Sequence, residues 1–240
     1  MKPFFTSFIL IIVLFSSCKE APITGENLLD RAINYHDPNG NWSTFNATFK
    51  VRMKTPNGSD RLSTISINLL EDYFSLTANR DTITTKYTIN KDVCTIGLNE
   101  NTTIDETTAK AYNLSCNRAN MYKNYYTYLY GLPMKLRDPG THISETVETT
   151  TFKGKDYLML NAKYEKDVGT DIWYFYFDPE TYAMEIYQFF KQDENGNQKD
   201  DTGEYILLTE EAVVNNIKMP KKRAWFYNKD DGYLGTDILD

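Results

Sequence analysis

The sequence predicts a mainly β fold of the α+β class, built on one large, curved antiparallel sheet. Apolar and polar residues alternate from Phe45 to Lys54, which is typical of a strand with one buried face. Turn sequences such as Pro56-Asn57-Gly58-Ser59 separate further segments of this kind, and few segments have helical spacing. An antiparallel meander of about ten strands must curl or be covered by other elements.

The expected elements alternate along most of the chain. We expect strands at 45–54, 61–70, 73–79, 82–89, 93–98, 143–152, 157–165, 171–178, 182–191, 204–209 and 223–227. Helices are expected at 26–35, 105–112 and 118–130, the last with its apolar and tyrosine side chains at helical spacing and its end at Gly131. The sequence contains no internal repeat or linker, so residues 25–240 are predicted to form a single β-rich domain.

The N-terminus indicates where the protein resides. A positive start and a short apolar run precede Ser16-Ser17-Cys18, and the segment LFSSC resembles a bacterial lipobox. This resemblance implies a signal peptide at 1–17, lipidation of Cys18, a short tether at 18–24 and attachment to a membrane through the lipid. Lys19-Glu20 resembles the charged pairs that direct some Bacteroidota lipoproteins to the cell surface. We expect a cell-envelope protein of the outer membrane, facing the periplasm or the surface; the alternative is a secreted protein with a chance cysteine.

Charge and cysteine content narrow the class further. The formal net charge is −7, with scattered basic residues, which argues against a nucleic-acid partner. After lipidation two cysteines remain, Cys94 and Cys116, which in an oxidising compartment are a disulfide candidate. Two buried free thiols are the alternative. The sequence does not indicate an oligomeric state.

Enzyme and metal motifs are absent from the sequence. His36 and His142 each lie beside a predicted turn, and no local pattern supplies a nucleophile with a base. The acidic segment 193–204 has oxygen side chains at several positions of a calcium loop, but Gln198 replaces the required glycine and the flanks are expected strands, so a solvated hairpin tip is the simpler explanation. We therefore expect a non-enzymatic protein with no cofactor and no bound metal.

Aromatic residues are abundant, with 18 Tyr, 13 Phe and 3 Trp, enough to line a ligand pocket or to fill a core. In the segment 173–177, alternate residues point to opposite faces, so that one face is core and the other carries two tyrosines. The candidate pocket-lining residues are Phe49, Tyr122, Tyr125, Leu129 and Phe175. A tyrosine-rich core without a cavity remains the alternative.

Four segments carry a resemblance to a known family: YHDPNGNW (35–42), YLYGLPMKLRDPGT (128–141), YFYFDPETY (174–182) and LGTDIL (234–239). They resemble an uncharacterised, flavobacterial-type Bacteroidota lipoprotein family near the LolA/LolB lipoprotein-carrier superfamily. The resemblance implies a half-barrel whose concave face is covered by helices and holds acyl chains or lipoproteins. Asp81-Thr82-Ile83 also resembles a Bacteroidota O-glycosylation site, with Thr82 as the acceptor.

Two functions are therefore expected from the sequence. The first is a membrane-anchored envelope lipoprotein that binds a hydrophobic or lipid-like ligand between sheet and helices. The second is a structural or interaction lipoprotein whose core is fully packed and whose surface docks an envelope partner. An emptiable apolar cavity distinguishes the two.

Overall fold

The computed structural model describes residues 22–240, and the signal-peptide and lipidation predictions for residues 1–21, Cys18 included, lie outside this range. The described chain forms one sheet of thirteen strands. The strands are β1 (Asn46–Thr55), β2 (Gly58–Asn68), β3 (Tyr73–Arg80), β4 (Ile83–Asn90), β5 (Val93–Leu98), β6 (Thr141–Ile143), β7 (Glu148–Phe152), β8 (Lys155–Tyr164), β9 (Ile172–Phe177), β10 (Met184–Phe190), β11 (Glu204–Val214), β12 (Ile217–Tyr227) and β13 (Tyr233–Leu239).

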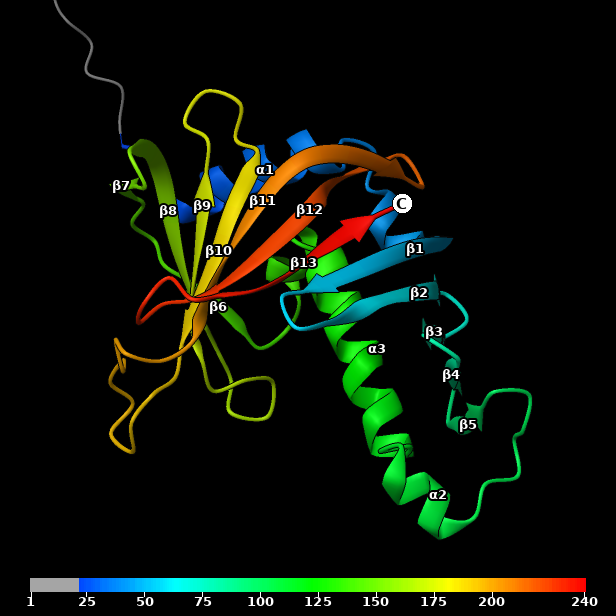
Figure 1. The fold of residues 1–240 in the computed structure, drawn as a ribbon. Coiled ribbons are helices and arrows are strands. Elements are labelled where there is room, and N and C mark those ends of the chain that lie inside the picture. The colour runs from blue at the N-terminus through cyan, green and yellow to red at the C-terminus, as the bar shows by residue number, and fades with distance from the viewer. Residues whose placement is uncertain (1–21) are drawn as a thin grey trace, which may run out of the picture.

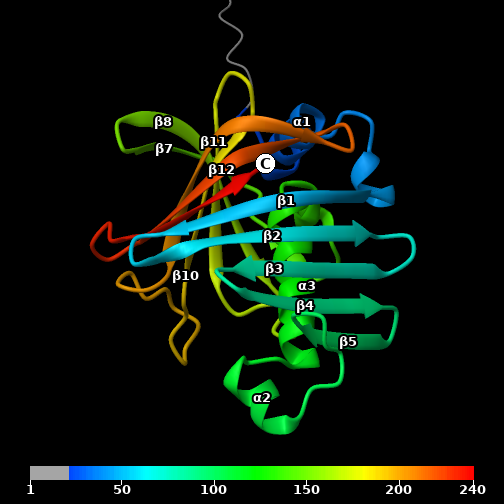
Figure 2. The same ribbon diagram turned by 45° about the vertical axis from the view of Figure 1, so that its right-hand side comes forward.

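The sheet is antiparallel, and its first strand, β1, pairs with its last, β13, near the centre. The strand order is β5-β4-β3-β2-β1-β13-β12-β11-β10-β9-β8-β6, with β7 paired to β8. Neighbours are consecutive in sequence except where β1 pairs with β13 and where β6 pairs with β8. The sheet bends strongly between its β1–β5 part and its β8–β12 part (Figures 1 and 2). The predicted curved antiparallel sheet is confirmed.

Three helices accompany the sheet: α1 (Gly25–His36), α2 (Glu106–Ala111) and α3 (Cys116–Tyr130). Thr24 and Ser115 cap α1 and α3, each accepting a hydrogen bond from the backbone N–H three residues later. α3 lies in the bend of the sheet beside β1–β5, and α1 contacts β12 (Figure 2). Two short 3₁₀ helices, η1 (Asn41–Thr44) and η2 (Met134–Arg137), follow α1 and α3.

One hydrophobic core fills the space between the helices and the concave face. It combines Leu28 and Leu29 of α1, Tyr126 and Tyr130 of α3, and inward residues from strands on both sides of the bend. Phe175 and Phe177 are fully buried there, as expected for one face of β9. A smaller cluster on the other face of the sheet contains Tyr157, Tyr176 and Ile186.

Two close contacts fix the position of α3. A disulfide joins Cys94 on the edge strand β5 to Cys116, the first residue of α3. At the other end of α3, a Cβ on Gly131 would lie 2.2 Å from Cζ2 of Trp42. Only glycine allows the indole to pack so closely, which brings the segments 35–42 and 128–141 together.

The strand predictions differ from the structure at three places. In place of one strand at 143–152 there are two short strands, β6 (Thr141–Ile143) and β7 (Glu148–Phe152), separated by residues 144–147. The strands expected at 204–209 and 223–227 are longer, because the hairpin between them extends to Val214 and Ile217. β13 was not expected, because Gly235 and Asp237 are residue types that strands disfavour.

Candidate functional site

A row of charged and apolar side chains crosses the centre of the concave face. Arg223 of β12 pairs with Asp237 of β13, Asp237 pairs with Met53 of β1, and Met53 pairs with Arg61 of β2. Residues directly opposite in antiparallel strands share a face, so these four side chains point toward α3. Arg223 and Asp237 are only 1% and 4% exposed.

Three tyrosines of α3 each contact one charged residue of this row. Tyr125 donates a hydrogen bond to Oδ2 of Asp237 at 3.3 Å, and the Tyr126 hydroxyl accepts one from Arg61 at 3.3 Å. The guanidinium of Arg223 lies over the ring of Tyr130, 3.9 Å from its centroid, and donates to the carbonyl oxygen of Pro220. Tyr126 and Tyr130 are four residues apart and share one helix face, with Tyr125 at its side, so α3 contacts three different strands.

Several buried polar atoms of this cluster have no hydrogen-bond partner among the described residues. They include Oδ1 of Asp237, Nε of Arg61, Nε of Arg223 and the hydroxyls of Tyr130 and Tyr187. Burial raises the pKa of Asp237, and the positive charges of Arg61 and Arg223 oppose that increase. Burial also raises the pKa of Tyr125 well above its usual value, with the Asp237 charge adding to the effect. Unpartnered buried atoms are costly, which makes this cluster a candidate site.

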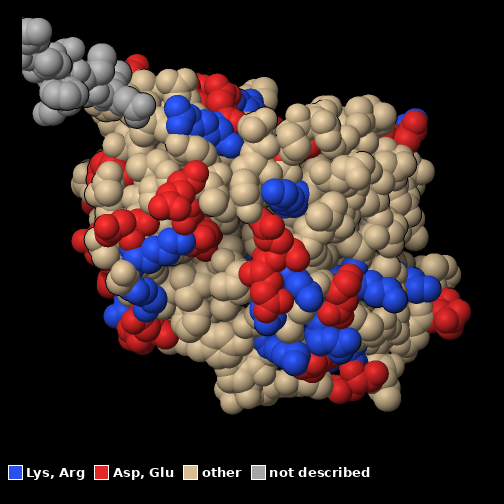
Figure 3. Space-filling model, turned by 90° about the horizontal axis from the view of Figure 1, so that it is seen from above, with Lys and Arg blue, Asp and Glu red and all other residues tan. Residues whose placement is uncertain are grey.

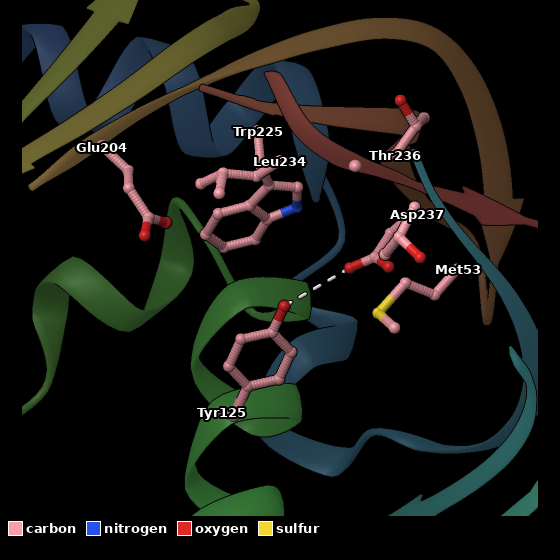
Figure 4. Close-up of a pocket in the computed structure, with 9 residues that line it drawn as sticks. Met53, Tyr125, Glu204, Trp225, Leu234, Thr236 and Asp237 are labelled. Atoms are coloured by element: carbon pink, nitrogen blue, oxygen red, sulfur yellow. Dashed lines mark hydrogen bonds between the residues drawn. The ribbon is translucent and has the colours of Figure 1, made fainter. Parts of the chain in front are cut away.

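A pocket of about 200 Å³ opens beside this cluster, between α3 and strands β1, β12 and β13 (Figure 4). Its wall is largely apolar, with Met53, Trp225 and Leu234 on the sheet side and the ring of Tyr125 on the helix side. The Tyr125 and Trp225 rings are stacked, with centroids 6.2 Å apart. In Figure 4, Trp225 and Leu234 lie in the middle, with Asp237 on one side of them and Glu204 on the other. The remaining lining residues are Thr55, Gly235 and Thr236.

Irregularities in two strand pairs lie at this pocket. The register shifts between Met53 and Thr55 in the β1–β2 pair and between Trp225 and Phe226 in the β12–β13 pair. A β-bulge bends the strand and redirects its side chains, and bulges are common beside binding sites. The shifts fall beside Thr55 and Leu234, and both of these residues line the pocket.

The five side chains proposed from the sequence as pocket lining do not all meet at one pocket. Tyr125 lines it, whereas Phe49, Leu129 and Phe175 are buried in the packed core. Tyr122 packs against Tyr87 and Tyr126. Sequence reasoning missed Met53, Trp225, Leu234 and Asp237. Of these only Asp237 offers a sequence signal, because a charged residue at an inward position of a strand often belongs to a site.

A second hollow lies near the C-terminal end of α1, where His36 is 2% exposed. Its Nδ1–H donates to the Lys218 carbonyl oxygen, and its Nε2 accepts from the backbone N–H of Met184. Burial lowers the pKa of His36. Both ring nitrogens are therefore used to join α1 to β10 and β12, which is a structural role.

The other sequence candidates lie at the surface. Thr82 is exposed in the turn between β3 and β4, and His142 is exposed beside Glu165. In the 193–204 segment, the Asp193 carboxylate accepts hydrogen bonds from the backbone N–H groups of Asn195 and Asn197, which closes a hairpin tip. Within residues 22–240, no group of three or more His, Cys, Asp or Glu side chains is arranged to hold a metal ion.

The surface and the helices of the described range give two further observations. In Figure 3, acidic and basic side chains are interspersed over the face shown, without a large patch of one sign. No helix within residues 22–240 has the length and apolar character required to cross a bilayer.

A family model matches residues 2–239. The chain belongs to DUF6503, a family of unknown function. A comparison with curated proteins gave no match. Among solved structures, this DUF6503 chain is similar to a LolA superfamily protein from Nitrosomonas europaea, with 10% identity, a TM-score of 0.50 and coverage of 91% of this chain and 92% of the other. It is also similar to a DUF1329 family protein from Desulfovibrio piger, with 7% identity, a TM-score of 0.51 and 90% of each chain covered. At such identities the likeness shows a LolA-like fold.

Proposed function

We propose that this protein is a non-enzymatic binding protein that holds a hydrophobic ligand, such as an acyl chain, in the pocket between α3 and strands β1, β12 and β13. The observation that carries the proposal is the apolar pocket itself, which opens on the concave face of a LolA-like sheet. The proposal includes an anchor: lipid on Cys18 would hold the protein at a membrane of the cell envelope.

The size of the pocket limits what enters it. Its volume of about 200 Å³ exceeds that of the engineered apolar cavity of about 150 Å³ that binds benzene, and is below the roughly 300–1,000 Å³ of drug-sized sites. In this conformation the pocket therefore accepts a small apolar group or the end of one chain. Each Å² of apolar ligand surface that is buried contributes about 25 cal/mol.

A second candidate function is an interaction lipoprotein that docks an envelope partner. It is favoured by the dense packing of Phe49, Leu129 and Phe175, which leaves most of the concave face filled by the protein's own side chains. The two functions predict different behaviour toward apolar probes.

The test is a pocket-filling variant. N-phenyl-1-naphthylamine, an uncharged fluorescent probe, is titrated into residues 19–240, which include the whole described fold. Leu234→Trp adds volume inside the pocket, and Leu70→Trp, at a side chain 69% exposed and outside it, is the matched control. We expect probe binding by the parent and the control and at least about tenfold weaker binding by Leu234→Trp, since the filled pocket no longer buries apolar probe surface. Equal binding by all three, or none by any, would favour the interaction lipoprotein.

A further inference from the structure

The polar groups of the pocket indicate which ligand head group it accepts. Asp237 lines the pocket and is 4% exposed, and its Oδ1 has no hydrogen-bond donor in the described part of the chain. Its Oδ2 already accepts from Tyr125 at 3.3 Å. A carboxylate oxygen only accepts hydrogen bonds, so the group that satisfies Oδ1 must be a donor.

The two arginines near Asp237 do not offer a site for an anion. Neither Arg61 nor Arg223 is among the residues that line the pocket. Arg61 donates to Tyr126, while Arg223 donates to Pro220 and lies over the ring of Tyr130. Their positive charges act on Asp237, but they do not line the pocket. A ligand therefore meets the carboxylate and not the guanidinium groups.

A second carboxylate borders the same pocket. Glu204, at the start of β11, lies on the opposite side of Trp225 and Leu234 from Asp237 (Figure 4). An anionic head group would meet a carboxylate at either end of the pocket, and juxtaposed like charges oppose binding. An ammonium group at Asp237 would lie close to Arg61 and Arg223, whose positive charges act on that carboxylate. An uncharged donor avoids both penalties.

We propose that the pocket selects apolar ligands that end in an uncharged hydrogen-bond donor, a hydroxyl or an amide N–H, over the same chain ending in a carboxylate or an ammonium group. This inference rests on the proposed function, because it names the ligand class of the same pocket. Asp237 Oδ1 accepts the hydrogen bond of the ligand, and Met53, Trp225 and Leu234 contact the chain.

The experiment compares three ligands of equal chain length. Octanol, octanoate and octylammonium compete with N-phenyl-1-naphthylamine for residues 19–240 at neutral pH. We expect octanol to bind at least about tenfold more tightly than octanoate, and more tightly than octylammonium. Octanoate or octylammonium binding as tightly as octanol would overturn the inference and leave the proposed function intact. Competition by none of the three, with the probe itself bound, would overturn the inference alone, and failure of the probe to bind would overturn both.

Variants then connect the preference to the named residue. Asp237→Asn keeps an acceptor oxygen and removes the charge, so the preference for octanol over octanoate should fall by about tenfold. Asp167→Asn, at an exposed position outside the pocket, should leave the preference unchanged. Glu204→Gln supplies a second test if Asp237→Asn does not fold, and should reduce the preference in the same direction. An unchanged preference in the folded pocket variants would contradict selection by these carboxylates.

Discussion

Removal of the Cys94–Cys116 disulfide should destabilise the protein by about 3 kcal/mol. The bond links residues 22 apart in sequence, and a cross-link over a loop of this length reduces the entropy of the unfolded chain by about that amount at 25 °C. The change proposed is the double replacement Cys94→Ala with Cys116→Ala. Cys116 is exposed and Cys94 half-buried, so alanine removes little buried surface and the effect reports mainly on the cross-link.

The effect should appear both in global stability and in the position of α3. For a chain of this length, 3 kcal/mol lowers Tm by about 6–12 °C. Because the bond ties the start of α3 to the edge strand β5, its loss should also speed proteolytic cleavage in the segment 99–115.

The assay is urea unfolding of the parent, the double variant and the parent under reducing conditions. The double variant and the reduced parent should lose the same free energy of unfolding, while the oxidised parent retains it. A difference below about 1 kcal/mol between oxidised parent and double variant would refute the loop-entropy reasoning. Uptake of two equivalents of a thiol reagent by the native, unreduced protein would show that the bond is not formed.

Three further predictions concern packing, pH and anchoring. Gly131→Ala should lower the free energy of unfolding by about 1–3 kcal/mol, because the added Cβ would overlap Trp42. Gly169→Ala is the control: its Cβ would lie 3.6 Å from the nearest atom, so it should have little effect in the same unfolding assay. Burial lowers the pKa of His36 below its usual 6.5, so the contribution of neutral His36 to the free energy of unfolding should be full above that pH and decline as the pH falls below it. His36→Gln should flatten this part of the curve of unfolding free energy against pH. A decline that persists unchanged in the variant would contradict the account. Cys18→Ala should abolish fatty-acid labelling and move the protein out of the membrane fraction or leave an uncleaved precursor, and unchanged labelling would rule out the lipidation site.

The sequence predicted the elements whose local pattern is strong. The alternation from Phe45 to Lys54 marks β1, and the spacing of Tyr122, Tyr126 and Leu129 marks α3 almost to its observed bounds. These signals are local, because they depend on the side-chain period of a single element. The prediction of a curved sheet rested on the number of such strands and on their short connections.

The pocket could not be predicted in the same way, because it depends on register between distant strands. Arg61 is far in sequence from Arg223 and Asp237 and comes near them only because β1 pairs with β13. The register shifts that follow Met53 in β1 and Trp225 in β12 have no clear sequence signal. Local periodicity identified inward aromatic residues, but it could not distinguish those that line a cavity from those that fill the core.

Native mass spectrometry of the gently purified protein tests the central claim most directly. Residues 19–240 should carry a lipid-like adduct on a fraction of the molecules, which organic extraction releases, and the Leu234→Trp variant should carry none because the added indole fills the pocket between Tyr125 and Trp225. Absence of an adduct from both proteins, together with no probe binding at micromolar concentration, would contradict the claim that the concave face holds a hydrophobic ligand.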